Sequence, residues 1–312
     1  MNKLLFAALL TGALVSSAYA ADYTIIAPAG PGGGWDQTAR TMQDALQAEG
    51  ISGNVQVTNV PGAGGTIGLA QFANQYAGNP EALIVGGYVM VGAVLTNQSP
   101  VSLQNVAPIA RLTGESDVIV VPANSELQTI DDLVAMLKAD PGSVSWAGGS
   151  AGGVDHIAAG LLAKEVGVDP TQVNYIAYSG GGEALAAILG GQVTVGISGV
   201  GEFASQIEAG ELRALAVTGA EPVGDIPTLQ DSGIDVVVEN WRMVAAAPGL
   251  TPEQEAAINA DIEAMVASDT WTTALANKGW VDTYLAGDAF DAQLAEDIEA
   301  TTAILKEIGL VQ

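Results

Sequence analysis

Short apolar runs alternate with amphipathic segments along most of the chain, beginning with a β-rich run that ends at Pro28. Residues 36–48 follow, with apolar positions three and four apart, which is the spacing of a helix that buries one face. The same order recurs as a strand over 55–60, a helix over about 66–76 and a buried strand over 83–87. This alternation predicts an α/β fold with a largely parallel sheet.

The pattern restarts after a strand predicted over 117–121, and a second block of similar build follows. Its helices are predicted over 125–140, from 155 to about 166 and over 183–189, and its strands over 144–147, 173–177, 193–197 and 212–217. A last strand is predicted over 234–238. Beyond it the chain is mostly helical, with one helix capped by Thr251 and others over 269–278 and 288–308.

Two blocks of similar build predict two lobes. The first is assigned residues 21–121 and 237–312, and the second residues 122–236. We expect the C-terminal helices to return to the first lobe, so that the chain crosses between lobes twice, near Val121 and near Val236. These two crossings would form a hinge.

The N-terminus has the features of a secretory signal peptide. Lys3 precedes an apolar stretch over 4–15, and Ala18-Tyr19-Ala20 gives the small-x-small cleavage pattern, so cleavage is predicted after Ala20. The alternative is a buried N-terminal helix, because the stretch is too short to span a bilayer. We therefore expect export to the periplasm.

Composition limits the classes of partner. The chain has no cysteine, so its stability must come from an apolar core, and hydrophobic residues make up 49% of it. Its 35 acidic residues against nine basic ones give a net charge of -26, which repels nucleic acid and anionic lipid. We expect a monomer whose partner is a small molecule, with no nucleic acid.

Four glycine-rich loops each follow a predicted strand and precede a predicted helix. They are the first loop (29–34), the second loop (61–65), the third loop (148–153) and the fourth loop (179–182). A helix N-terminus presents unpaired N–H groups and partial positive charge, and glycine lets a ligand approach them. Such loops bind anions, although each could also be no more than a tight turn. Asp155 and Glu183, which follow two of the loops, are interpreted as helix-start residues.

The loops lack the known phosphate-binding motifs, which limits the type of anion that they are expected to bind. None matches a P-loop, and the glycines over 62–68 are spaced one residue too far apart for a dinucleotide fingerprint. A carboxylate is the simpler candidate, because a few N–H and hydroxyl donors satisfy it. No cofactor is expected.

The third loop also matches the Gly-x-Ser-x-Gly elbow of serine hydrolases, with Ser150 as the nucleophile. Such an enzyme needs a histidine well downstream, but the single histidine of the chain is His156, six residues away. His156 is interpreted as a helix-start or packing residue, with ligand contact as the alternative. One histidine and no cysteine also argue against zinc, so neither a catalytic nor a metal site is predicted.

Two of the glycine-rich segments are distinctive, namely Pro28–Arg40 (PAGPGGGWDQTAR) and Asn59–Gly68 (NVPGAGGTIG). Weaker motifs follow over 178–184, 189–193, 227–233 and 240–243. Together these motifs, which cover nearly the whole mature chain, resemble the periplasmic solute-binding proteins of tripartite tricarboxylate transporters. The Gly-Gly-Gly-Trp-Asp form is similar to the tricarboxylate-binding branch of that family.

The resemblance implies a type II periplasmic-binding-protein fold, with a ligand cleft between two α/β lobes. It also implies a membrane permease of one large and one small subunit as partner. The loops would hold one carboxylate, partly through water. The positions carried over are Gly33, Gly34, Trp35, Asp36, Ser150, Gly152, Ser179 and Gly180.

Several of these side chains have two interpretations. Trp35 could wall the ligand or fill the core. Asp36 could cap its helix or accept a hydrogen bond from a ligand hydroxyl or an ordered water. Arg40 lies four residues later, where an ion pair with Asp36 is favoured. Arg242 is one of few cations, and it could hold a distal carboxylate in bidentate fashion or form a structural ion pair.

The predicted function is capture of a di- or tricarboxylate, with citrate first, and its delivery to the permease by hinge closure. One alternative is a protein that presents the ligand to a membrane sensor kinase. Another is a serine hydrolase built on Ser150.

Overall fold

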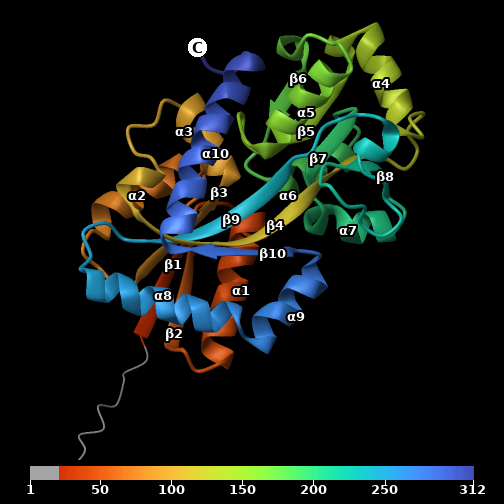
Figure 1. Cartoon of the computed structure of the whole chain (residues 1–312). Helices are drawn as coiled ribbons and strands as arrows, with labels where there is room; N and C mark the ends of the chain where they lie inside the picture. Colours follow the sequence, from red (N-terminus) through yellow and green to blue (C-terminus); the bar gives the residue numbers. More distant parts are fainter. Residues whose placement is uncertain (1–20) are drawn as a thin grey trace, which may run out of the picture.

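The computed structural model describes residues 21–312, so the predicted signal peptide and its cleavage site after Ala20 lie outside the described residues. The described chain is an α/β fold in which the strands join in one curled sheet (Figure 1). The predicted fold class is confirmed. The sheet is mixed, however, with parallel strands at its two ends and antiparallel strands between them.

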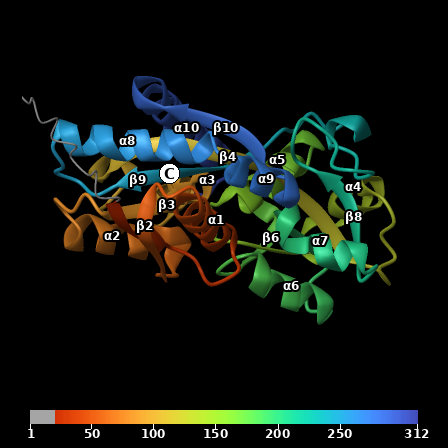
Figure 2. The ribbon, with the colours of Figure 1, turned by 90° about the horizontal axis from the view of Figure 1, so that it is seen from below.

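The first part of the sheet is centred on β1, which pairs in parallel with β2 and β3. Next to β3 lies β9, which is antiparallel to it. The strands are β1 (Ala21–Ala27), β2 (Ser52–Asn59), β3 (Ala82–Gly87), β9 (Glu239–Ala246) and β10 (Val281–Ala286). The helices packed on them are α1 (Gly34–Ala48), α2 (Thr66–Gln75), α3 (Tyr88–Thr96), α8 (Pro252–Val266), α9 (Asp269–Lys278) and α10 (Gly287–Glu307). Figure 2 shows α8 and α10 on one side of β9, with α1 and α2 on the other.

The second part of the sheet has β5 in parallel contact with β6 and β7. Its strands are β5 (Ser145–Gly148), β6 (Asn174–Ala177), β7 (Val195–Gly199) and β8 (Leu212–Val217). Its helices are α4 (Ile130–Ala139), α5 (Val154–Glu165), α6 (Gly181–Leu189) and α7 (Val200–Glu208).

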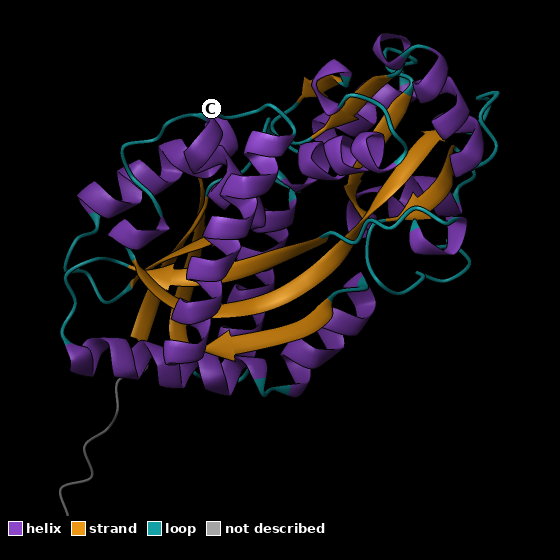
Figure 3. Cartoon of the chain, turned by 45° about the horizontal axis from the view of Figure 1, so that its top comes forward, coloured by secondary structure: helices purple, strands orange, loops and turns teal. Residues whose placement is uncertain are grey.

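The long strand β4 (Ala107–Pro122) belongs to both parts (Figure 3). Its first half pairs with β9 and β10, and its second half pairs with β7 and β8. Separate apolar cores lie around the two halves of this strand. The first core draws on residues between Tyr23 and Leu112 and between Trp241 and Leu294, whereas the second draws on residues between Val118 and Val238.

The C-terminal helix α10 touches both parts. Phe290 and Leu294, near its start, are buried in the first core. Leu305 and Ile308, near its end, form a small apolar cluster with Ile157 of α5. The C-terminal helices therefore return to the first part as predicted, but the last turn of α10 packs on the second.

Some predicted elements differ from the structure. The strand predicted over 234–238 is wrong, because this segment is extended and alternates between buried and exposed residues without pairing in a ladder; the strand β9 begins at Glu239. The helix predicted from Ser125 begins at Ile130, after a capping box formed by Thr129. Helix α3 was not predicted, because its sequence YVMVGAVLT has no polar face and so no helical period.

No helix within residues 21–312 combines the length and the apolar character needed to cross a bilayer.

Candidate functional site

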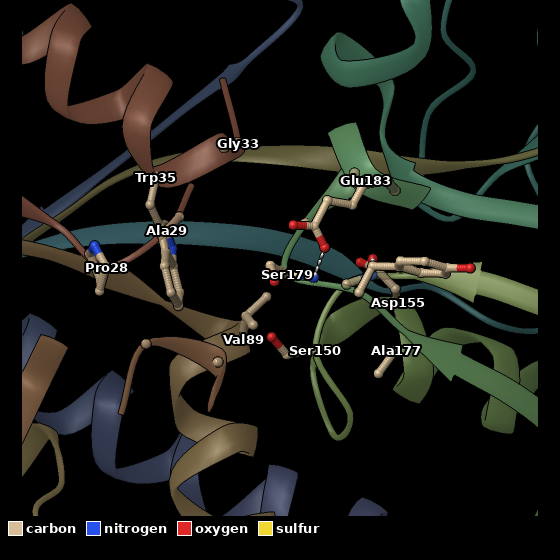
Figure 4. Close-up of a pocket in the computed structure, with 18 of the residues that line it drawn as sticks. Pro28, Ala29, Gly33, Trp35, Val89, Ser150, Asp155, Ala177, Ser179 and Glu183 are labelled. Atoms are coloured by element: carbon tan, nitrogen blue, oxygen red, sulfur yellow. Dashed lines mark hydrogen bonds between the residues drawn. The ribbon is translucent and has the colours of Figure 1, made fainter. Parts of the chain in front are cut away.

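All four glycine loops line one cavity of about 390 Å³. The cavity lies where the carboxyl ends of β1, β2, β5 and β6 lead into helices, which is where open α/β sheets bind ligands. In Figure 4, Trp35 reaches the cavity from one side, and Ser150, Ser179 and Glu183 lie across from it. The loops that the sequence placed in separate blocks thus face one another.

Seven of the nine predicted site residues line this cavity. They are Gly33, Gly34, Trp35, Ser150, Ser179, Gly180 and Arg242. Asp36 and Gly152 do not line it, because their polar groups are used inside the loops. Further polar residues line the cavity without having been predicted as site residues, among them Ser198, Glu202 and Asn240.

Asp36 holds the first loop and the start of α1 in shape. Its carboxylate accepts hydrogen bonds from the Gly32 N–H and the Asn59 Nδ2, both at 2.8 Å, and from the Arg40 Nε at 3.0 Å. Burial alone would raise the pKa of Asp36, but the hydrogen bonds outweigh it, so this pKa lies below its ordinary value. The ion pair expected between Asp36 and Arg40 is present.

A side chain from the following helix also accepts a hydrogen bond from the backbone of the third loop. The Gly152 N–H donates to Nδ1 of His156 at 3.3 Å, and the imidazole stacks on Tyr175 with ring centroids 4.0 Å apart. Burial lowers the pKa of His156 to about 4, so the ring is neutral at pH 7. His156 is therefore a packing residue. Because Nδ1 of the neutral ring accepts the Gly152 N–H, Nε2 carries the proton, and His156 has no nitrogen left to act as a base toward Ser150.

The N-terminus of α1 shows why glycine is needed in the first loop. A Cβ atom on Gly34 would overlap the guanidinium of Arg242, which packs directly against this residue. The Gly34 N–H points to the carboxylate of Glu202, whose Oε1 accepts it at 3.1 Å. Trp35, next in sequence, is 8% exposed, and it both borders the cavity and packs against the first core.

Arg242 is the one arginine or lysine that lines the cavity among residues 21–312, and it is 2% exposed. Its Nη2 pairs with Oε1 of Glu115, whose Oε2 accepts the Trp280 Nε1 at 2.8 Å. The guanidinium also lies over the Trp280 ring, 4.9 Å from its centroid. The structural ion pair considered for Arg242 is thus present. Its Nη1, however, is buried with no hydrogen-bond partner in the described chain.

Carboxyl groups are unusually dense around the cavity. Burial, followed by the charges of Asp155 and Glu115, raises the pKa of Asp117 well above its ordinary value. Burial also raises the pKa of Asp155, although a hydrogen bond from the Gly149 N–H opposes it. Burial and the charge of Glu115 raise the pKa of Glu202 to about 7. An anion in this cavity must therefore rely on backbone N–H groups and on Arg242.

A carboxylate from the following helix also caps the fourth loop. The Ser179 N–H donates to Oε2 of Glu183 at 3.1 Å (Figure 4), so Glu183 caps the loop that starts α6. Asp155 caps the third loop in the same way through Gly149. Both residues have the helix-start role that their positions suggested, and both also border the cavity.

Glu202 was missed because the helix that carries it was missed. It lies in the first turn of α7, after β7 ends at Gly199. A strand followed by Gly199-Val-Gly201 is a further example of the strand–glycine–helix pattern, and this signal could have pointed to it.

The comparisons with known proteins give one consistent result. The family model for the tripartite tricarboxylate transporter family receptor matches residues 38–310. The protein BugT of Bordetella pertussis is 28% identical over 292 residues, which cover 91% of this chain and 88% of BugT.

The fold is also found in solved structures. The periplasmic binding protein BugD superposes with a TM-score of 0.84 at 21% identity, covering 93% of this chain and 98% of BugD. MatC from Rhodopseudomonas palustris, solved with bound malate, superposes with a TM-score of 0.79 at 21% identity, covering 91% of this chain and 98% of MatC.

Proposed function

The chain belongs to the tripartite tricarboxylate transporter family of receptors, which are substrate-binding proteins and not enzymes; on this basis we propose that it captures a small di- or tricarboxylate, with citrate as the first candidate. The acid is then delivered to a membrane permease of one large and one small subunit. The chain acts as a monomer in the periplasm, after removal of residues 1–20.

The observation that carries this proposal is the convergence of four glycine loops on one cavity. Helix N-termini favour carboxylates because their N–H groups are unpaired and their dipoles point the same way. The cavity volume of about 390 Å³ lies within the usual range for small-molecule sites, which is ~300–1,000 Å³. The malate bound to MatC supports a dicarboxylate or a close relative as the ligand.

The ligand contacts proposed are Gly33, Gly34, Trp35, Ser150, Ser179 and Gly180, with Arg242 for a distal carboxylate. The unpartnered Nη1 of Arg242 supports its part in this set, since a buried charged donor without a partner is costly unless a ligand satisfies it. Asp36 and Gly152 do not contact the ligand in this proposal. They maintain the conformation of the loops that do.

Binding is coupled to closure about a hinge. We assign residues 21–121 with 237–312 to one lobe and residues 122–236 to the other. The two apolar cores support such a division, since the first ends at Leu112 and resumes at Trp241, whereas the second runs from Val118 to Val238. The last turn of α10 spans the division and must slide or release when the lobes move. The closed form presents the ligand to the permease.

A thermal-shift panel tests the proposal. Citrate, malate, succinate and adipate are each added to the mature protein, with succinamide as an uncharged match for succinate. A ligand that binds only the folded state stabilises it by ~2.7 kcal/mol at 100 times its Kd, so at least one acid should raise the unfolding temperature. Succinamide should not. No shift with any acid, or equal shifts with succinate and succinamide, would reject the substrate class.

Transport is separated from sensing in cells. Deletion of the gene should abolish uptake of the radiolabelled acid. Retained uptake with loss of a transcriptional response would instead identify a sensor protein.

A further inference from the structure

Glu202 places a carboxylate of the protein itself between two of the helix N-termini that line the cavity. We propose that Glu202 occupies the position of a ligand carboxylate in the ligand-free protein and must be displaced on binding. The inference rests on the proposed function, and it names what a carboxylate ligand must replace.

One side of the Glu202 carboxylate meets α1. Oε1 accepts the N–H of Gly34 at 3.1 Å, across 168 residues of sequence. The N-cap residue of α1 is Gly33, which has no side chain to cap the helix. Glu202 therefore supplies from α7 the carboxylate that this helix N-terminus favours.

The other side of the carboxylate meets α6. Oε2 lies so close to Gly181, the first residue of α6, that a Cβ atom there would overlap it. This oxygen is shielded from solvent and has no hydrogen-bond partner within residues 21–312. One oxygen is satisfied and the other is not, so the site fits this carboxylate only in part.

The charges around Glu202 weaken its hydrogen bond with Gly34, so that a ligand carboxylate can replace it. Glu115 on β4 and Asp155 on α5 repel an ionised Glu202, whereas Arg242 on β9 attracts it. A ligand carboxylate that took the Gly34 N–H could also reach toward the unpartnered Nη1 of Arg242, which Glu115 leaves free. Glu202 borders the cavity, so the open space that a displaced side chain would enter lies next to it.

Displacement of Glu202 predicts the direction in which the ligand affinity changes when the side chain is removed. The contact stabilises the ligand-free protein and is absent from the bound one, so its removal should tighten binding. It also joins α1 of the first core to α7 of the second, so its removal should leave the ligand-free protein more open.

The variants Glu202→Ala and Glu202→Asp test the affinity, with citrate, malate and adipate each titrated by calorimetry. The aspartate variant keeps the charge, but its shorter side chain cannot reach Gly34 in the same way. Both variants should therefore bind about tenfold more tightly than the wild type. Glu208→Gln, at the exposed end of the same helix, is the matched control and should bind as the wild type does.

Two outcomes of these titrations count against the proposal. Weaker binding by Glu202→Ala would overturn it. Tighter binding by Glu202→Ala alone would also overturn it, since charge repulsion would then suffice to explain the effect.

Small-angle X-ray scattering without any ligand separates this inference from the proposed function. Ligand-free Glu202→Ala should have a larger radius of gyration than the wild type and than Glu208→Gln. An unchanged radius would overturn the inference even if the protein binds carboxylates. An increased radius would support it even if every acid in the panel fails to bind.

Discussion

Arg242 and Glu115 form an ion pair in which both side chains are 2% exposed. The pair lies under the first loop, where the guanidinium packs against Gly34. A charge this deeply buried is tolerated only with its partner, because water no longer solvates it. The pair therefore holds the Arg242 side chain in place beside the cavity. It leaves one guanidinium nitrogen, Nη1, without a hydrogen-bond partner within residues 21–312.

Arg242→Met should destabilise the protein strongly, because it leaves the buried Glu115 carboxylate without its cationic partner. The expected loss in the free energy of unfolding is about 3–5 kcal/mol, measured by urea denaturation. The double variant Glu115→Gln/Arg242→Met should recover much of this loss. A double variant less stable than Arg242→Met would show that the pair is not the source of the effect.

The same arginine should distinguish ligands. If Nη1 holds a distal carboxylate, Arg242→Ala weakens binding of a tricarboxylate far more than binding of a monocarboxylate, as measured by calorimetry. Equal losses for citrate and acetate would reject the distal role and leave Arg242 as a structural residue.

Glycine is required at position 34 and not throughout the first loop. Gly34→Ala should reduce binding and stability together, because the added methyl group overlaps the Arg242 guanidinium. Gly30→Ala is the matched control, since nothing lies within 4 Å of a Cβ atom there. In the fourth loop, Gly181→Ala and Gly182→Ala form a second such pair, with overlap only at Gly181. Similar effects within either pair would contradict the account of close packing.

Asp36 should make stability depend on pH. Its pKa is lowered in the folded protein, so its contribution is present above the unfolded pKa of about 3.9 and is lost as pH falls through the lower folded value. Asp36→Asn should therefore cost about 2 kcal/mol at pH 7 and progressively less below pH 4. Asp44→Asn, on an exposed position of the same helix, should cost little at any pH. A constant deficit for Asp36→Asn down to pH 2 would argue against ionic hydrogen bonding.

The packing of the end of α10 against α5 should contribute to the stability of the protein. Ile308 is 2% exposed and packs against Ile157 and against Gly160 of α5. Ile308→Ala should lower the free energy of unfolding by about 2–5 kcal/mol. Ile67→Ala is the control, because Ile67 is 53% exposed. If both variants are equally stable, the packing of the end of α10 on α5 does not contribute to stability.

The loops were predictable from the sequence because their chemistry is local. A strand, a run of glycines and a helix start are visible in the order of residues, and such turns gather at one edge of a sheet. The direction of a single side chain is not visible in this way. Trp35 borders the cavity, whereas its neighbour Asp36 turns to Arg40 and Asn59, although the resemblance gave both the same role.

Long-range contacts were harder still to predict. Glu115 and Arg242 are 127 residues apart, and only the antiparallel pairing of β4 with β9 brings them together. The strand expected over 234–238 has the right alternation but no partner to pair with, which alternation alone does not reveal. Helix α3 was hidden because burial on all sides removes the polar positions that give a helix its period.

A crystal structure of the mature protein with its tightest-binding acid tests the central claim most directly. The account predicts a carboxylate of the ligand within hydrogen-bond distance of the Gly34 N–H, between the first and fourth loops, with the Glu202 side chain moved away. A ligand whose carboxylates lie elsewhere, with the cavity unfilled and Glu202 still bonded to Gly34, would contradict it.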